Sequence, residues 1–308
     1  MRYLEAAIRL GSLRKAALEV GTGQPTLSQQ IRRLEEDLNV NLLIRRSNGV
    51  LPSAEARILL PHIRQVLQAD RALQEEAALI NGLRSGCVRL GAVTTAGQIL
   101  LPEVVPLYRD SFPNVRFSVW EASTAAVRDK VTNGELDLGL VAEPGDRAID
   151  PGLNSTDLIS DEILLCVPRG HPLADKEIVT ASDLKGQSWV LPARGYAARD
   201  LVDSRFAPAD QDVVYETTNP HTTLLMVAAR VGIALLSRSA LLSHRAEDIV
   251  TPATDWDPPR LTVSMIARTD TQPGPAVRKL IEVLRKVSAE RSEAALRRPT
   301  ASSIRSPR

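Results

Sequence analysis

The fold is decided by the stretch GSLRKAALEVGTGQPTLSQQIRRLEEDL, residues 11–38, in which a Gly-Thr-Gly turn separates two helical segments. Ser12 is a favoured N-cap for the first segment. Pro25 fits the first turn of the second, because a proline there lacks only an amide that has no intrahelical partner. A short helix precedes the stretch, so a compact three-helix bundle is predicted. The predicted helices cover residues 3–9, 12–20 and 24–38.

The helix over residues 24–38 has one face for packing and one free face. Its leucines and isoleucine repeat at helical spacing, which directs them into the bundle. The other side chains lie outward, so the helix can hold the bundle together and also contact another molecule. The inward residues are Leu27, Ile31, Leu34 and Leu38, and the outward or flanking ones are Thr26, Ser28, Gln29, Arg32 and Arg33.

A short hairpin is predicted directly after the bundle. Apolar runs at residues 42–44 and 50–51 flank Arg-Arg-Ser-Asn-Gly at 45–49. Asn-Gly between two such runs is a strong signal for a tight hairpin turn. The hairpin therefore has the character of a wing, with Arg45 and Arg46 beside its turn and Asn48 at its tip.

One long helix is predicted from its N-cap Ser53 to Ile80, a length of about 40 Å at 1.5 Å per residue. Its apolar residues follow alternating steps of three and four, with Asp70 as a polar member of the seam, so the helix needs a partner helix. Pro61 should bend it or restart it locally. A hinge is predicted at Ser85-Gly86. The seam consists of Leu59, Ile63, Val66, Leu73, Ala77 and Ile80.

Beyond Cys87, strand-like and helix-like segments alternate, which favours a parallel sheet covered by helices. A second series of this kind begins near residue 163, and the last strand and helix can return to the first series, as in two-lobed binding folds. The final helix is predicted over 276–288. The Arg-rich tail after Ala289 has no periodicity and is predicted to be disordered.

Charge and composition narrow the class of protein. Residues 1–64 carry ten Lys or Arg against six Asp or Glu, a local excess of four positive charges in a chain with net charge +1. Such an excess fits DNA binding. Aromatic residues make up only 3%, which disfavours single-strand binding by base stacking. The two cysteines, Cys87 and Cys166, have no neighbour at metal-ligand spacing, so reduced, buried thiols and no metal or cofactor are expected.

The same residues resemble a known family. GSLRKAA at 11–17 followed by QPTLSQQIRRLEEDL at 24–38 is similar to the N-terminal signature of LysR-type transcription regulators. GELDLGL at 134–140 and HPLA at 171–174 resemble the effector domain of that family, so the likeness covers nearly the whole chain. Two departures stand out: Gln29 replaces the usual arginine, and the chain begins at what resembles the middle of the family's first helix.

The resemblance implies an α/β fold with an N-terminal all-α winged helix-turn-helix, a long linker helix and two Rossmann-like lobes similar to a type 2 periplasmic binding protein. It implies three partners: double-stranded DNA, a small-molecule effector and further copies of the chain, in a homodimer paired through the linker helix or a homotetramer. RNA polymerase is a further candidate. No membrane partner is expected, and the chain is expected in the cytoplasm. The expected domains are 1–52, 53–86 and 87–288, with lobe 1 at about 87–160 and 267–288, lobe 2 at about 161–266, and a tail at 289–308.

The DNA contacts are expected on the outward face of the third helix and on the wing. By the family's pattern, residues at the start of this helix read bases; glutamine can bond adenine and proline can touch a thymine methyl. The arginines are expected to contact phosphates, which would make affinity fall with salt. Pairing of individual arginines with Glu35, Glu36 or Asp37 is the alternative. The predicted contacts are Gln24, Pro25, Thr26, Ser28, Gln29, Arg32, Arg33, Arg45, Arg46 and Asn48.

The effector is expected where strands end and helices begin, because free amides at helix amino ends attract anions. An organic anion is the predicted class, with Arg194 as a candidate carboxylate partner. Helix capping is the alternative for the Ser, Thr and Asn residues, and a satisfied surface histidine for His221. The candidates are Thr94, Thr95, Ser123, Thr124, Arg194, Asn219 and His221.

An enzyme and a solute-binding protein are the competing classes. The sequence has no nucleophile elbow, phosphate-cradling glycine loop, His-Glu-x-x-His motif or cysteine pair, and its four histidines are scattered. A solute-binding protein would have two lobes but would need an export signal and would not need the first 80 residues. A DNA-binding regulator accounts for more of the chain.

Overall fold

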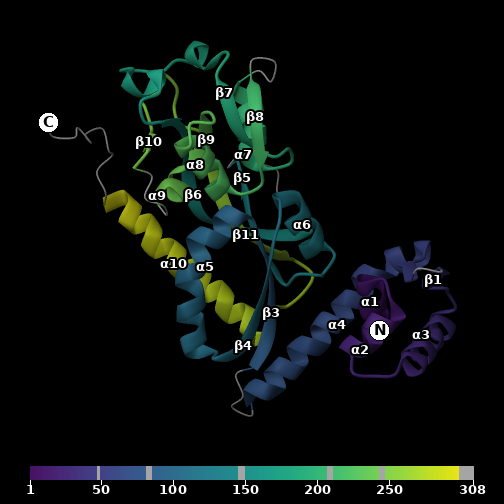
Figure 1. The fold of residues 1–308 in the computed structure, drawn as a ribbon. Coiled ribbons are helices and arrows are strands. Elements are labelled where there is room, and N and C mark those ends of the chain that lie inside the picture. Colours follow the sequence, from purple (N-terminus) through teal and green to yellow (C-terminus); the bar gives the residue numbers. More distant parts are fainter. Residues whose placement is uncertain (47–48, 81–84, 145–149, 207–210, 243–246, 298–308) are drawn as a thin grey trace.

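The computed structural model describes residues 1–46, 49–80, 85–144, 150–206, 211–242 and 247–297. A small helical domain at one end is joined through one long helix to a larger α/β domain (Figure 1). Asn48, the expected wing tip, and residues 298–308 lie outside the described residues.

The N-terminal domain is the expected three-helix bundle with a hairpin. The Ser12 hydroxyl accepts the Lys15 amide at 3.3 Å, as an N-cap does. Leu4, Leu27 and Leu42 are fully buried in the core. The elements are α1 (Arg2–Leu10), α2 (Leu13–Glu19), α3 (Gln24–Leu38), β1 (Leu43–Arg46) and β2 (Gly49–Pro52), with β1 and β2 antiparallel.

The wing is fixed against the turn that follows α1. The Val50 amide donates to the Gly11 carbonyl oxygen at 3.0 Å. Gly49 has a φ of +144°, and a Cβ at this position would lie 2.3 Å from the same oxygen. Only glycine fits here, because a side chain would both strain the backbone and force the wing away from the bundle.

The linker is the 27-residue helix α4 (Ala54–Ile80). Ser53 caps it, since its hydroxyl accepts the Ala56 amide at 2.9 Å. The helix runs through Pro61 without a break in its assignment. Two residues of the predicted seam turn inward: Ile63 is buried in the core of the N-terminal domain, and Leu59 packs against that core.

A mixed sheet forms the centre of the α/β domain, with the order β10-β6-β11-β5-β3-β4 and β9 paired to β6. The predicted parallel arrangement holds for β4-β3-β5 and for β7-β8, whereas β11, β6, β9 and β10 pair antiparallel. The strands are β3 (Ser85–Ala92), β4 (Asn114–Glu121), β5 (Leu138–Glu143), β6 (Leu153–Pro168), β7 (Ser188–Pro192), β8 (Asp212–Thr217), β9 (Ala234–Ser237), β10 (Ile249–Val250) and β11 (Arg260–Arg268).

Two separate cores show that this domain has two lobes. The first core gathers β3, β5, α5 and α10, and the second gathers β7, α7 and the far end of β6. β6 and β11 run through both lobes, and the Ile163 amide donates to the Pro259 carbonyl at 2.8 Å where the chain enters and leaves lobe 2. The helices are α5 (Thr94–Ser111), α6 (Thr124–Thr132), α7 (Ala197–Arg205), α8 (Pro220–Ala228), α9 (Arg238–Leu242), α10 (Pro275–Arg297), and the 3₁₀ turns η1 (Pro172–Asp175) and η2 (Ala181–Leu184).

The C-terminal helix differs from the prediction. α10 continues to Arg297, so residues 289–297 are helical and not part of an irregular tail. Arg291 of this extension pairs with Glu103 of α5 at 2.5 Å, a contact that the sequence pattern does not reveal.

Candidate DNA interface and effector cleft

The start of α3 presents the predicted base-reading residues on its surface. Gln24, Pro25, Thr26 and Gln29 are exposed, and Ser28 is half-buried. No described side chain caps the amino end of α3, whose N-cap is Gly23. Free backbone amides therefore remain at this end, where a phosphate can bind them.

The wing lies beside this surface. The Arg45 guanidinium donates a hydrogen bond to the Ser28 hydroxyl at 2.9 Å, so β1 and α3 present their polar groups together. Arg32, Arg33 and Arg46 are also exposed. Four exposed arginines therefore lie on α3 and β1, the two elements that carry the predicted DNA contacts.

The carboxylates near these arginines have other roles or stay apart. Glu35 accepts the amides of Leu42 at 2.7 Å and Leu43 at 3.1 Å, which holds the first strand of the wing. Within the described ranges, no ion pair joins the four arginines to Glu35, Glu36 or Asp37. The alternative of mutual pairing therefore has no support in the structure, and the arginines are available to phosphates.

The outer face of α4 carries a stripe of exposed apolar side chains. Ile58, Val66, Leu73 and Ile80 are between 51% and 85% exposed. The last three recur every seven residues, which is the repeat of a helix that packs against another helix. In the first turns of α4 the exposed stripe does not follow the predicted seam. The seam residues Leu59 and Ile63 face the N-terminal core there, and Ile58 is exposed instead.

The effector cleft lies between the lobes and holds a cavity of about 80 Å³. Four helices begin at its wall: α5 and α6 from lobe 1, and α7 and α8 from lobe 2. Three of the predicted residues line it, namely Thr95, Thr124 and Asn219. Thr94, Ser123, Arg194 and His221 do not; Arg194 is exposed on the loop after β7.

Capping accounts for part of this polar set. Ser123 accepts the Ala126 amide at 3.4 Å, and Asn219 accepts the His221 amide at 2.9 Å. The Thr124 hydroxyl donates to the Ala142 carbonyl at 3.0 Å, which ties α6 to β5. Thr124 and Asn219 therefore shape the wall whether or not they also contact a ligand, whereas Ser123 caps α6 without lining the cavity.

Sequence reasoning missed several residues of the cavity, most notably Asp161 on β6 and Tyr196 before α7. Asp161 is 5% exposed. Burial raises the pKa of its carboxyl, although the Ser239 amide, which donates at 3.2 Å, opposes the shift. An aspartate beside a glutamate, in Ser-Asp-Glu, is typical of a surface segment, so no local signal marks it.

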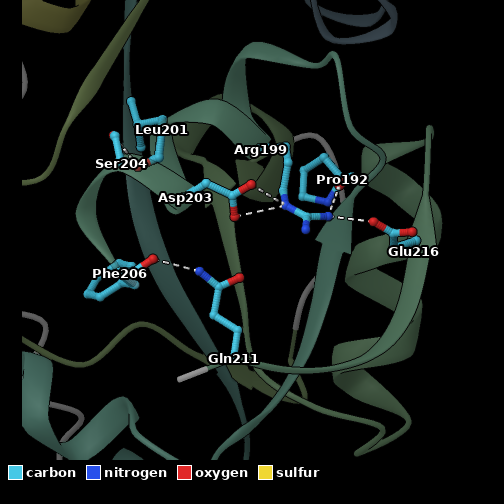
Figure 2. A network of polar contacts seen from close by, with 8 residues as sticks. All are labelled: Pro192, Arg199, Leu201, Asp203, Ser204, Phe206, Gln211 and Glu216. Atoms are coloured by element: carbon cyan, nitrogen blue, oxygen red, sulfur yellow. Dashed lines mark hydrogen bonds and ion pairs between the residues drawn. The ribbon is translucent and has the colours of Figure 1, made fainter. Parts of the chain in front are cut away.

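A buried arginine fixes the lobe 2 wall (Figure 2). Arg199 of α7 is 3% exposed and donates to both oxygens of Asp203 at 3.0 Å. It also donates to the Pro192 carbonyl at 3.2 Å and pairs with Glu216. Because Pro192 ends β7 and Glu216 lies near the end of β8, this one side chain sets the spacing of both strand ends at the cleft.

The two cysteines sit apart from the cleft wall. Cys166 is buried on β6, as predicted, but the prediction of a buried thiol is wrong for Cys87, which is exposed on β3. Burial raises the pKa of both thiols, to about 12 for Cys166. Neither has the lowered pKa that makes a thiol reactive. In the described part of the chain, no group of three His, Cys, Asp or Glu side chains could hold a metal ion.

A winged helix-turn-helix, a linker helix and a two-lobed domain with a cleft together define a DNA-binding transcription regulator of two domains. The chain belongs to the LysR family. Residues 1–57 match the bacterial regulatory helix-turn-helix proteins of the lysR family, and residues 81–289 match the LysR substrate binding domain. The predicted fold class is confirmed, and the protein is a regulator and not an enzyme.

Similar proteins span the same length. The DNA-binding transcriptional dual regulator OxyR of Escherichia coli K12 is 32% identical over 290 residues, with 92% of each chain covered. A full-length OxyR point variant from Pseudomonas aeruginosa has a TM-score of 0.75 and 26% identity, and the match covers 93% of this chain and 92% of that one. CbnR in complex with target DNA, at 21% identity and a TM-score of 0.60, shares the fold; 92% of this chain and 97% of that one are covered. None of the helices in the described ranges is long and apolar enough to cross a membrane.

Proposed function

We propose that this regulator reads specific double-stranded DNA with the amino end of α3 and the wing, and that a small organic effector in the cleft modulates that binding. The observation that carries the proposal is the convergence of four helix amino ends, from both lobes, on one cavity. A ligand that touches both lobes favours one relative position of the lobes, which is a shift in population and needs no chemistry.

The cavity has one feature that fits the predicted organic anion and one that does not. Helix amino ends favour the organic anion predicted from the sequence. However, the described lining of the cavity contains no lysine or arginine, and its one carboxyl group belongs to Asp161. The predicted role of Arg194 as a carboxylate partner has no support from its exposed position. A small, mostly apolar molecule with polar ends fits this wall best.

Peroxide sensing through a thiol is a second candidate, since several relatives are named hydrogen peroxide-inducible genes activators, among them one from Dickeya chrysanthemi. Peroxide oxidises thiolates, and a thiol with a raised pKa forms little thiolate near neutral pH. Cys87 and Cys166 both have raised pKa values. We therefore propose reversible ligand binding in place of cysteine oxidation for this chain.

We further propose that two copies of the chain pair through the exposed stripe of α4 in the cytoplasm, where they meet DNA. Burying these side chains would remove apolar surface from water and place two reading helices on one duplex. A homotetramer and a contact with RNA polymerase stay predictions from the resemblance.

Selection of bound duplexes from a randomised library tests the DNA part. We expect repeated rounds with the full chain to enrich one motif, with two half-sites about 34 Å apart or a multiple of this spacing, if two copies bind. The same selection with Arg45→Ala and Gln24→Ala together is the control and should enrich nothing. Equal enrichment by the control, or none by the unaltered chain, would contradict sequence-specific binding through this surface.

A further inference from the structure

One carboxyl oxygen in the cleft lacks a partner. Asp161 lies on β6 where this strand passes from lobe 1 to lobe 2, opposite Leu261 of β11. Its Oδ1 atom accepts the Ser239 amide at 3.2 Å, at the start of α9. Its Oδ2 atom is buried and has no hydrogen bond among the residues that the structure describes. The side chain also lines the cavity.

Such an oxygen is costly unless something binds it. A buried acceptor without a partner loses the hydrogen bonds that it makes with water in the unfolded chain, and the loss is greater when the acceptor is charged. Proteins therefore rarely keep one without a reason, and a site for a ligand is one such reason. Burial also raises the pKa of this carboxyl, because the charged form is disfavoured away from water.

The nearby cations are already engaged. Arg238 and Arg260 both pair with Glu162, at 2.6 and 2.8 Å, on the neighbouring position of β6. Neither lines the cavity. The hydroxyls of Ser237 and Ser239 lie close enough to Asp161 to lower the pKa of its carboxyl, but Oδ2 accepts no hydrogen bond in the described part of the chain, so a donor on a bound ligand can fill this position.

We infer that Asp161 selects the effector, and that the effector carries a donor group, an ammonium, amide N–H or hydroxyl, that binds the free Oδ2 atom. This inference rests on the proposed effector site and specifies its ligand. A carboxylate elsewhere on the same molecule can still meet the helix amino ends of the cavity. A simple carboxylate offers no donor to this oxygen, so it is expected to bind less tightly than a donor-bearing molecule with the same skeleton.

A purely structural role is the competing explanation, in which Asp161 only holds the start of α9 through Oδ1. Asp161→Asn separates the two. Asparagine keeps an oxygen for the Ser239 amide but places an amide N–H₂ donor where Oδ2 was. A structural role predicts unchanged ligand preference in this variant, whereas a selecting role predicts a reversed one.

The experiment uses the full chain and a library of small fragments in matched sets. Each set has one apolar skeleton, such as a phenyl ring, bearing a carboxylate alone (phenylacetate), an ammonium alone (benzylamine) or both (phenylglycine). Ligand-observed NMR measures binding to the unaltered chain, to Asp161→Asn and to Asp157→Asn. Asp157 is the matched control, since it lies on the same strand outside the cavity and its carboxylate accepts the Ser264 hydroxyl. Thr218→Phe blocks the cavity from an exposed position and defines which fragments bind in the cleft.

We expect donor-bearing members to bind in the cleft at least roughly tenfold more tightly than their carboxylate-only partners, as for other sites built around a buried polar group. Asp161→Asn should reduce or reverse this ratio, and Asp157→Asn should leave it unchanged. The inference is overturned if carboxylate-only fragments bind most tightly in the cleft. It is also overturned if Asp161→Asn leaves the ratio of the two affinities unchanged. In both cases the proposed effector site is still supported. If no fragment in the library depends on the cleft, the effector site itself is contradicted, and the inference falls with it.

Discussion

The Arg45 guanidinium of the wing donates a hydrogen bond to the Ser28 hydroxyl of the reading helix, across 2.9 Å. The two elements that carry the predicted DNA contacts are thus joined by a hydrogen bond within the chain itself. This hydrogen bond holds Arg45 beside Ser28 of α3, and the first prediction concerns this arginine.

Replacing Arg45 by alanine should weaken DNA binding about equally for all sequences. A phosphate contact carries no base information, so the slope of log affinity against log salt should become shallower by about 1. Fluorescence anisotropy over a range of salt concentrations measures this slope. Arg116→Ala, at an exposed arginine of the effector domain, is the control and should bind as before. A change in base preference with an unaltered slope would instead assign Arg45 to base reading.

A charge on the exposed stripe of α4 should separate the subunits. Leu73→Glu places a carboxylate at a side chain that is 69% exposed in the single chain, so folding should be kept while helix pairing is lost. Sedimentation velocity should show a shift toward the mass of one chain. Ile178→Glu, at a 54% exposed site in lobe 2, should change nothing. An unaltered mass for Leu73→Glu would place the subunit contact elsewhere.

Arg199 is expected to stabilise the folded chain, because it joins the ends of β7 and β8 at the cleft wall. Arg199→Met removes a buried cation and leaves Asp203 and Glu216 without it, but both carboxylates are partly exposed and can regain water. A loss of roughly 1 to 3 kcal/mol in the free energy of unfolding is therefore expected, below the cost of a fully buried broken pair. Urea unfolding measures it. Arg205→Met, at an exposed position of the same helix, should cost less than about 0.5 kcal/mol, a typical limit for surface sites.

The stability difference between the unaltered chain and Asp161→Asn should depend on pH. The folded-state pKa of Asp161 is raised, so the protonated carboxyl is favoured by folding. Its contribution is fully present below the unfolded-state pKa and is lost as pH rises through the folded-state pKa. The unaltered chain should therefore lose stability relative to Asp161→Asn on going from acid to neutral pH. Urea midpoints for both proteins over this range test it, and a difference that is constant with pH would contradict the raised pKa.

The N-terminal domain could be predicted almost to the residue, because its signals are local. Ser12 and Ser53 cap their helices through their own hydroxyls, and Pro25 marks the first turn of α3. These features act within one turn of helix and need no knowledge of the rest of the chain. The helical periodicity also predicted which side of α3 is exposed.

The effector domain was harder to predict, because its pairing is between distant segments. The first half of β6 has a polar pattern, Asn-Ser-Thr-Asp, that only its long pairing with β11 turns into a strand. That pairing also brings Asp161 to the cavity, and Arg199 becomes a hub only when β7 and β8 end beside α7. The rule that ligands bind where strands end and helices begin located Thr95, Thr124 and Asn219, but it could not show which other side chains complete the wall.

The hydrogen bond between Ile163 and Pro259 has a consequence for protein engineering. Since the chain enters and leaves lobe 2 at adjacent points, lobe 2 is a cassette inserted into lobe 1, and its two ends match in position without any linker. Exchanging residues 163–259 for the equivalent segment of another family member would replace one wall of the cleft while keeping Asp161, the linker helix and the DNA-reading domain. Chimeric sensors that answer to new molecules on an unchanged operator can be built at this junction.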